Sequence, residues 1–104
     1  MKKAETRLKE RCLTDLRKLP NSWWVKIQQV VIRGTPDILG VKDGIFVAIE
    51  LKSDKNDVHD SRFKLQEYNL NCIGAAGGLV FVAHPENWDE VLAKIASVTK
   101  KEHL

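Results

Sequence analysis

The stretch RGTPDILGVKDGIFVAIELKSD, residues 33–54, decides the fold. Two apolar runs rich in β-branched residues, 38–41 and 45–51, flank the link KDG, which is a strong hairpin signal. Asp37, Glu50 and Lys52 stand at the ends of these runs that lie away from the link. The charges interrupt an otherwise apolar pattern, so they call for a physical explanation.

The spacing predicts that two of these charges face each other. If Asp43 and Gly44 form a two-residue turn, Lys42 faces Ile45, and further along the ladder Asp37 faces Glu50. Facing side chains have Cβ atoms about 4.5 to 5.5 Å apart, and like charges there are destabilising. A magnesium ion held by both carboxylates would compensate, because Mg²⁺ prefers oxygen ligands. The alternatives are a pair tolerated at an exposed strand end, or a three-residue turn that shifts the register.

Period-two alternation divides the second run between two faces. Residues 45, 47, 49 and 51 form an apolar face, whereas the opposite face begins with Phe46 and Ala48 and ends with Glu50 and Lys52. Lys52 therefore projects beside the acidic pair. Such a lysine can help to deprotonate a water held by a cation, or neutralise charge that develops on a phosphate. A simple ion pair with the carboxylates is the alternative.

Outward from the hairpin, the chain reads as a single α/β domain over residues 1–104. Apolar residues at helical spacing predict a helix over 3–19, ended by Pro20, and aromatic and β-branched residues predict a strand over 23–32. Beyond the hairpin, the patterns predict a helix over 61–75, a short buried strand over 79–83 and a helix over 85–98. The predicted order is αβββαβα, and 104 residues suffice for one compact core.

Composition narrows the class of protein. The formal net charge is +3, with basic residues crowding the first segment, which suits a nucleic-acid partner but also a solvated helix face. Lys26, Arg33, Lys55 and Arg62 are the candidate nucleic-acid contacts. The sequence has no apolar run of the ~18 residues that a membrane span needs, so we expect a cytoplasmic protein without membrane contact. Cys12 and Cys72 are expected to be buried, reduced thiols.

Two polar residues fall on predicted apolar helix faces. Glu5 lies within the arc of Leu8, Cys12 and Leu16, whereas Glu10 points nearly opposite, so Glu5 is expected to face inward. Gln66 shares a stripe with apolar residues of the second helix, where a buried amide needs partners. A frayed first turn is the alternative for Glu5, and a satisfied core amide is the alternative for Gln66.

These residues carry a resemblance. "PD", twelve residues, then "ELK" matches the PD-(D/E)XK nuclease motif at Pro36, Asp37, Glu50, Leu51 and Lys52. More closely, the chain resembles the stand-alone VRR-NUC (virus-type replication-repair nuclease) domains of bacteriophages. The likeness covers nearly the whole chain, through the N-terminal helix with its glutamate, "RGTPDILG", "GIFVAIELKS", "LQEYNLNCIGAAGG" and "HPENWDE".

The resemblance implies a restriction-endonuclease-like αβββαβ core, with a mixed sheet flanked by helices and a C-terminal helix. It also implies an endonuclease dependent on Mg²⁺ or Mn²⁺, with Asp37, Glu50 and the Leu51 backbone carbonyl as metal ligands. Glu5 would act through a metal-bound water, Lys52 would activate the nucleophile and Gln66 would help to position it. The sequence departs from the family pattern at 31–34, where "VIRG" stands in place of "VRR", and this leaves Arg33 as a candidate phosphate contact.

Stand-alone members of the family are similar to Holliday junction resolvases, so the resemblance implies branched DNA as partner and a homodimer, in the host cytoplasm if the protein is viral. A junction has two strands to cut, so a single-site chain that resolves junctions would need a twofold dimer. Trp23, Trp24 and Phe81 are candidates for its interface, or for ordinary core packing. Three alternatives remain: a broader nuclease that nicks DNA or cuts flaps or ends, an inactive DNA-binding module, and a structural protein.

Overall fold

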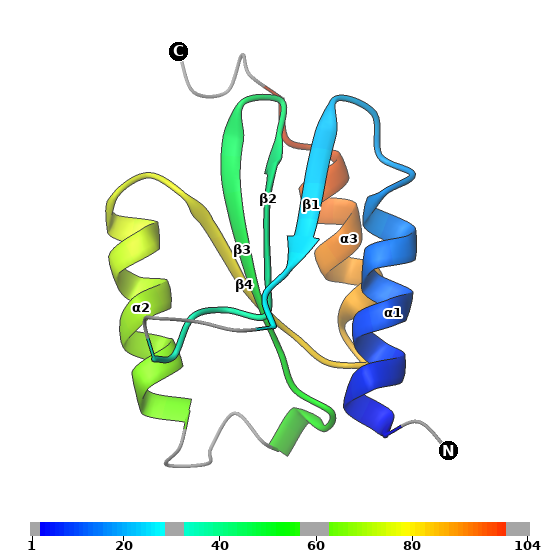
Figure 1. Ribbon diagram of the computed structural model, residues 1–104. Helices are drawn as coiled ribbons and strands as arrows, with labels where there is room; N and C mark the ends of the chain where they lie inside the picture. The colour runs from blue at the N-terminus through cyan, green and yellow to red at the C-terminus, as the bar shows by residue number, and fades with distance from the viewer. Residues whose placement is uncertain (1–2, 29–32, 57–62, 100–104) are drawn as a thin grey trace.

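The computed structural model describes residues 3–28, 33–56 and 63–99. The element order confirms the predicted αβββαβα arrangement (Figure 1). The elements are α1 (Ala4–Leu16), β1 (Ser22–Lys26), β2 (Ile38–Lys42), β3 (Ile45–Leu51), α2 (Lys64–Ala75), β4 (Leu79–Ala83) and α3 (Trp88–Ala96). β1 ends earlier than predicted, and the predicted stretch 29–32 lies outside the described residues. α2 begins at Lys64, and residues 61–62 of its predicted start also lie outside that part of the chain.

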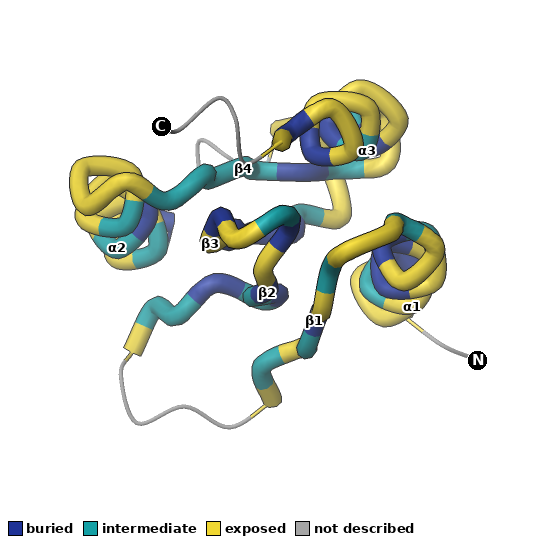
Figure 2. The backbone as a smooth tube through the Cα atoms, turned by 90° about the horizontal axis from the view of Figure 1, so that it is seen from above, coloured by how far each residue is buried: buried dark blue, intermediate teal, exposed yellow. Residues whose placement is uncertain are grey.

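The sheet is mixed and has the order β1-β2-β3-β4. β2 runs antiparallel to both of its neighbours, β1 and β3, and β4 runs parallel to β3 after the crossover through α2. α1 and α3 lie on one side of the sheet and α2 on the other (Figure 2). This layering gives every helix a sheet face on which to bury its apolar stripe. The second half of the hairpin, β3, is therefore an inner strand covered on both faces.

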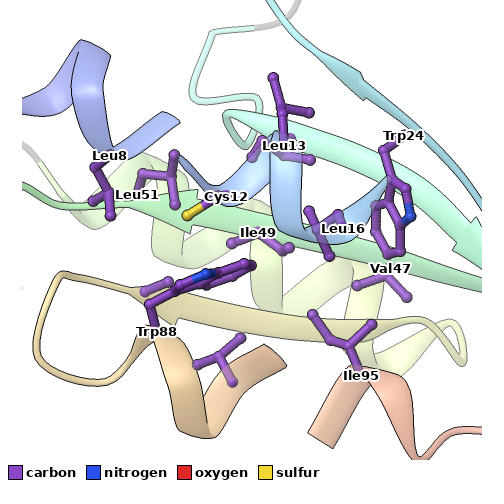
Figure 3. Packing of buried hydrophobic residues seen from close by; sticks show 13 residues of the cluster. Leu8, Cys12, Leu13, Leu16, Trp24, Val47, Ile49, Leu51, Trp88 and Ile95 are labelled. Carbon is purple, nitrogen blue, oxygen red and sulfur yellow. The ribbon is translucent and has the colours of Figure 1, made fainter. Parts of the chain in front are cut away.

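The larger core lies between β3 and the pair α1 and α3. Figure 3 shows side chains of both helices meeting over the apolar face of β3. The Trp88 indole N–H donates to the Asp15 carboxylate at 2.8 Å, and Arg11 pairs with Asp89 at 3.1 Å, so α1 is fixed to α3 by polar contacts as well. Cys12 is a free, buried thiol as predicted, and burial raises its pKa to about 12, which disfavours the reactive thiolate. Cys72, in α2, is exposed, contrary to prediction.

The second core lies under α2 and leaves part of the sheet uncovered. Ala48, Phe63 and Leu70 are buried there, with partly buried β4 residues packed around them, so β4 is less buried than predicted. Farther along the same face, Trp23 pairs with Val41 and Val41 pairs with Phe46 across the three strands, and all three are exposed. We call Trp23, Val41 and Phe46 the apolar row. Of the other aromatics proposed for an interface, Trp24 is buried in the larger core and Phe81 packs against it.

Gly40 tests how tightly β1 packs on β2. A Cβ at this position would collide with the Trp24 ring and the Trp23 carbonyl, neither of which can withdraw from the sheet. We expect Gly40→Ala to lower the free energy of unfolding by roughly 3 kcal/mol or more, measured by urea denaturation.

Gly74 supplies the control. A Cβ there would lie 3.6 Å from Val80 Cγ2, an ordinary contact, and Gly74 is in α2. Gly74→Ala should therefore raise stability by up to about 1 kcal/mol, because alanine is the better helix former. A Gly40→Ala variant as stable as the wild type would contradict the packing described for β1.

Candidate active site

The hairpin turn sets the register that the site requires. Asp43 and Gly44 have φ angles of 52° and 82°, and both are positive, as in the two-residue turns that join antiparallel strands. Lys42 pairs with Ile45, and the ladder continues in step to Ile38 and Ile49. The next pair along is Asp37 and Glu50. The predicted two-residue turn is thus confirmed, and the three-residue alternative is wrong.

Asp37 and Glu50 also point to the same side. The Ile27 N–H donates to the Asp37 backbone carbonyl at 2.8 Å, so the Asp37 backbone is bonded toward β1 and not toward β3. Facing residues of that kind form a non-hydrogen-bonded pair, in which the side chains approach most closely. The two acids therefore lie within reach of one cation or one shared proton.

Pro36 and Leu51 explain how the ladder ends here. In the same register Pro36 would follow as the partner of Leu51, but a proline has no N–H to donate to the Leu51 carbonyl. The Leu51 N–H instead donates to Asp37 Oδ2 at 2.8 Å. Because the N–H and C=O of a strand residue point to the same neighbour, the Leu51 carbonyl is directed to the side on which Asp37 lies. The proline thus leaves a backbone oxygen beside the two carboxylates.

Lys52 lies against Glu50 and an aromatic ring. Its Nζ is 3.3 Å from Glu50 Oε2 and 4.7 Å from the centroid of the Phe63 ring, within the range of a cation–π contact. The Lys52 N–H donates to the Ala83 carbonyl at 2.8 Å, which ties its backbone to the end of β4. The side chain is 15% exposed. The ammonium is therefore held beside the acids by both backbone and ring. Phe63 thus contributes to the site, although in the sequence it reads only as part of an apolar helix stripe.

The buried carboxyl of Glu50 has an altered proton affinity. Burial and the neighbouring Asp37 charge raise the pKa of Glu50 to about 8, although Lys52 opposes the change. Glu50 is 4% exposed, so water screens this repulsion poorly. Near neutral pH, and without a cation, the pair therefore holds a proton. A divalent cation would take the place of that proton.

Lys9 joins the site from α1, and the sequence analysis did not single it out. Its Nζ lies 3.9 Å from Asp37 Oδ1, and its side chain is 23% exposed. At about 100° per residue, Lys9 falls between the directions of Leu16 and Leu13, both of which are buried. The helical phase that selected Glu5 thus selects Lys9 as well. Its place among seven basic residues of the first segment hid that signal.

The structure contradicts the predicted position of Glu5 and agrees with that of Gln66. The expectation that Glu5 faces inward is wrong, because Glu5 is exposed in the first turn of α1, where burial begins one turn later at Leu8. Gln66 is half-buried on α2, one turn before the buried Leu70 and three residues after Phe63, which is buried just before the helix. Within residues 3–28, 33–56 and 63–99, no three or more His, Cys, Asp and Glu side chains gather closely enough to hold a metal. Glu5 is accordingly not a direct third carboxylate ligand.

The available donors nevertheless suit a hard cation. Two carboxylates and one carbonyl are all oxygen donors, and Mg²⁺ usually keeps several waters in addition to one or two carboxylates. Asp37 and Glu50, with the Leu51 carbonyl, are the groups that would hold it. The site lies where β3 ends, at the same end of the molecule as the first turn of α1 (Figure 1).

The candidate nucleic-acid contacts are spread around this end. Arg33 is exposed, and its carbonyl accepts a hydrogen bond from the Asn69 side chain at 2.9 Å, which fixes the approach to Asp37 against α2. Lys26 is exposed at the end of β1. Lys55 pairs with Glu86 at 3.5 Å, and both side chains are largely exposed. Arg62 lies outside the described residues.

The fold has a counterpart among solved structures. A domain described as "VRR_NUC domain" superposes with a TM-score of 0.69 at 20% identity, over 88% of this chain and 97% of that one. The chain has the VRR_NUC fold. No protein-family model and no curated protein sequence matches it. The likeness therefore establishes the fold, with its mixed sheet and C-terminal helix, as the resemblance implied. The roles of individual residues in this VRR_NUC fold are inferred from the geometry of the site.

The raised pKa of Glu50 leads to a pH dependence of stability. The folded protein keeps a proton on Glu50 up to about pH 8, whereas the unfolded chain releases it near 4.5. The resulting stabilisation is complete below 4.5 and is lost as the pH rises through 8. Glu50→Gln cannot ionise but keeps the shape and a hydrogen-bond donor, so in EDTA it should be more stable than the wild type by roughly 2 to 4 kcal/mol near pH 9.

Urea denaturation of both proteins across this pH range measures the difference. Glu67→Gln is the control, because Glu67 is an exposed acid in the first turn of α2. The control should follow the wild-type pH profile. Parallel profiles for Glu50→Gln and wild type would show that Glu50 ionises normally.

Proposed function

We propose that the chain is a divalent-metal-dependent, structure-selective DNA endonuclease, similar in action to Holliday junction resolvases. The observation that carries the proposal is the facing pair of Asp37 and Glu50, with Lys52 against Glu50, in a VRR_NUC fold. Carboxylates brought together at a strand end, with an ammonium beside them, are the groups that metal-assisted hydrolysis of a phosphodiester needs. The net charge of +3 suits a polyanionic substrate.

Each residue has a proposed role. Asp37, Glu50 and the Leu51 carbonyl bind Mg²⁺ or Mn²⁺, which when bound lowers the pKa of a water and stabilises charge on the phosphate. Lys52 orients the attacking water and takes part in its deprotonation, with its ammonium kept in place by Phe63. Gln66 helps to position the same water from α2. Glu5, exposed in the first turn of α1, contributes through a further water.

The proposed DNA path follows from the exposed charges. Lys26 is exposed at the end of β1, and Arg33 is exposed four residues before Asp37. Lys55 would break its ion pair with Glu86 to contact a phosphate. Breaking this pair costs little free energy because exposed ion pairs are weak. Arg62 is a further candidate. No helix in the described ranges has both the length and the apolarity to cross a bilayer.

A homodimer is part of this proposal. A junction resolvase cuts two strands, and one chain offers one pair of facing acids, so a twofold dimer supplies the second site. The apolar row of Trp23, Val41 and Phe46 is the surface we assign to the dimer contact. Trp23 is 64% exposed, and tryptophan is enriched among residues that anchor protein interfaces. Trp24 and Phe81, which pack in the core, are not part of it.

Two alternatives use the same site differently. A broader nuclease would nick duplexes or trim flaps and ends with the same residues. A module that binds DNA without cutting would not need Lys52 and Glu50 to be held together, and their contact favours an enzyme. A comparison of DNA substrates therefore distinguishes the proposed enzyme from the broader nuclease. Detection of any cleavage distinguishes it from the module that only binds DNA.

Cleavage of labelled four-way junction, flap and linear duplex DNA, with and without Mg²⁺, tests the proposal. The wild type should cut the junction in preference to the other two, and EDTA should stop it. Asp37→Asn and Glu50→Gln should abolish cleavage because each removes a metal ligand, yet both should bind the junction in an electrophoretic shift assay.

Lys52→Met refines the test, because it keeps the aliphatic stem on Phe63 and removes the ammonium. It should slow cleavage about 10²- to 10⁴-fold. Glu67→Gln again serves as a control and should cut at the wild-type rate. Cleavage by Asp37→Asn at that rate would exclude the proposed site, and equal cutting of all three DNAs would favour the broader nuclease.

The dimer contact makes a separate prediction. Trp23→Glu places a charge at the most exposed residue of the proposed contact, so it should weaken dimerisation at least about thirtyfold and shift the mass in solution from twice 11.8 kDa toward 11.8 kDa. Sedimentation measures this. Tyr68→Glu is the control, since Tyr68 is equally exposed, at 63%, but lies on α2. A dimer that survives Trp23→Glu and dissociates with Tyr68→Glu would move the interface to α2.

A further inference from the structure

Lys9 is attached to a part of the molecule that has little freedom to move. Its neighbours on α1, Leu8 and Leu13, are buried, and α1 is fixed to α3 through the Asp15 carboxylate. The Lys9 side chain extends from this rigid helix to Asp37, which lies at the start of β2. With an exposed fraction of 23%, its ammonium still touches solvent. The helix can thus stay in place while the flexible four-carbon stem swings.

The contact between Lys9 and Asp37 acts through charge and not through a close hydrogen bond. Asp37 Oδ2 accepts the Leu51 N–H at 2.8 Å, whereas Lys9 Nζ lies 3.9 Å from the other oxygen, Oδ1. A separation of 3.9 Å is beyond hydrogen-bond range. Lys9 therefore neutralises Asp37 without being locked to it.

Each acid of the pair consequently has its own ammonium. Lys52 lies against Glu50 at 3.3 Å and is held by the Phe63 ring, while Lys9 lies against Asp37 from the opposite layer of the fold. A divalent cation between the acids would meet a like charge in Lys9 at short range. That repulsion is relieved if the more loosely held ammonium turns outward, where a phosphate of bound DNA can receive it in competition with the exposed Glu5 carboxylate one turn earlier on α1.

We propose that Lys9 is a positioning residue that couples cation binding to DNA binding. It is the counter-ion of Asp37 in the metal-free protein, and when a divalent cation takes its place, its ammonium contacts a DNA phosphate. This inference rests on the proposed function. It gives the enzyme a tighter hold on DNA when the site is loaded than when it is empty.

The test compares wild type, Lys9→Met and the control Lys94→Met. Lys94 also pairs with a carboxylate, Glu90, at 3.3 Å, but on α3. Isothermal titration with Mg²⁺ measures cation affinity. Fluorescence anisotropy measures the affinity for a labelled four-way junction, once in EDTA and once in Ca²⁺, which prefers oxygen ligands as Mg²⁺ does.

Lys9→Met should bind Mg²⁺ about three- to tenfold more tightly, because it lacks the competing charge. It should bind the junction as the wild type does in EDTA, but about fivefold more weakly in Ca²⁺. Lys94→Met should change neither the Mg²⁺ affinity nor the ratio of the two DNA affinities. A residue that served the fold alone would not tighten Mg²⁺ binding when removed.

Two failures are distinguishable. If the wild type binds Mg²⁺ but Lys9→Met binds it no more tightly, or shows the wild-type ratio of DNA affinities, the role of Lys9 is overturned and the proposed nuclease stands. If the wild type binds no Mg²⁺, the metal site is overturned and the role of Lys9 falls with it.

Discussion

The close approach of two carboxyl groups, from Asp37 and Glu50, is the constraint on which the rest of this end of the molecule depends. Like charges on facing residues destabilise a sheet, and Glu50 is too buried for water to screen them. The structure offsets the repulsion in several ways at once. The Leu51 N–H and Lys9 each contact Asp37, Lys52 contacts Glu50, and a proton stays on the pair near neutral pH.

These compensations come from all layers of the fold. β3 supplies Glu50 and Lys52, and the residue before α2, Phe63, supplies the ring that holds Lys52. Lys9 arrives from α1, on the other side of the sheet. A small domain has few buried positions, so a site at a strand end that draws on both helical layers can be kept rigid without extra loops. The polar contacts between α1 and α3 therefore serve the site as well as the core.

Much of this arrangement could be predicted from the sequence because it depends on local rules. Asp43 and Gly44 fix the turn, the turn fixes the register, and the register places Asp37 opposite Glu50. The element order follows in the same way from hydrophobic periodicity. The prediction for Glu5 failed because periodicity gives direction but not depth: the first turn of α1 precedes the buried stretch that begins at Leu8.

Other features depend on distances that no local pattern contains. The contact of Lys9 with Asp37 joins residues that are 28 positions apart and lie in different layers, so helical phase could nominate Lys9 but could not identify its partner. The exposure of Cys72 likewise depends on how α2 packs in the fold, which the residues around it do not specify.

Pro36 shows how one residue can serve both the fold and the site. Proline cannot donate a ladder hydrogen bond, so it is tolerated at the beginning of a strand, where no such donor is required. Here that missing donor ends the pairing of β2 with β3 at the position where the Leu51 N–H becomes available to the Asp37 side chain. A residue with an N–H at position 36 could extend the ladder by one pair and engage the Leu51 carbonyl. The carbonyl would then be drawn into the sheet and would no longer be available as an oxygen donor beside the two acids.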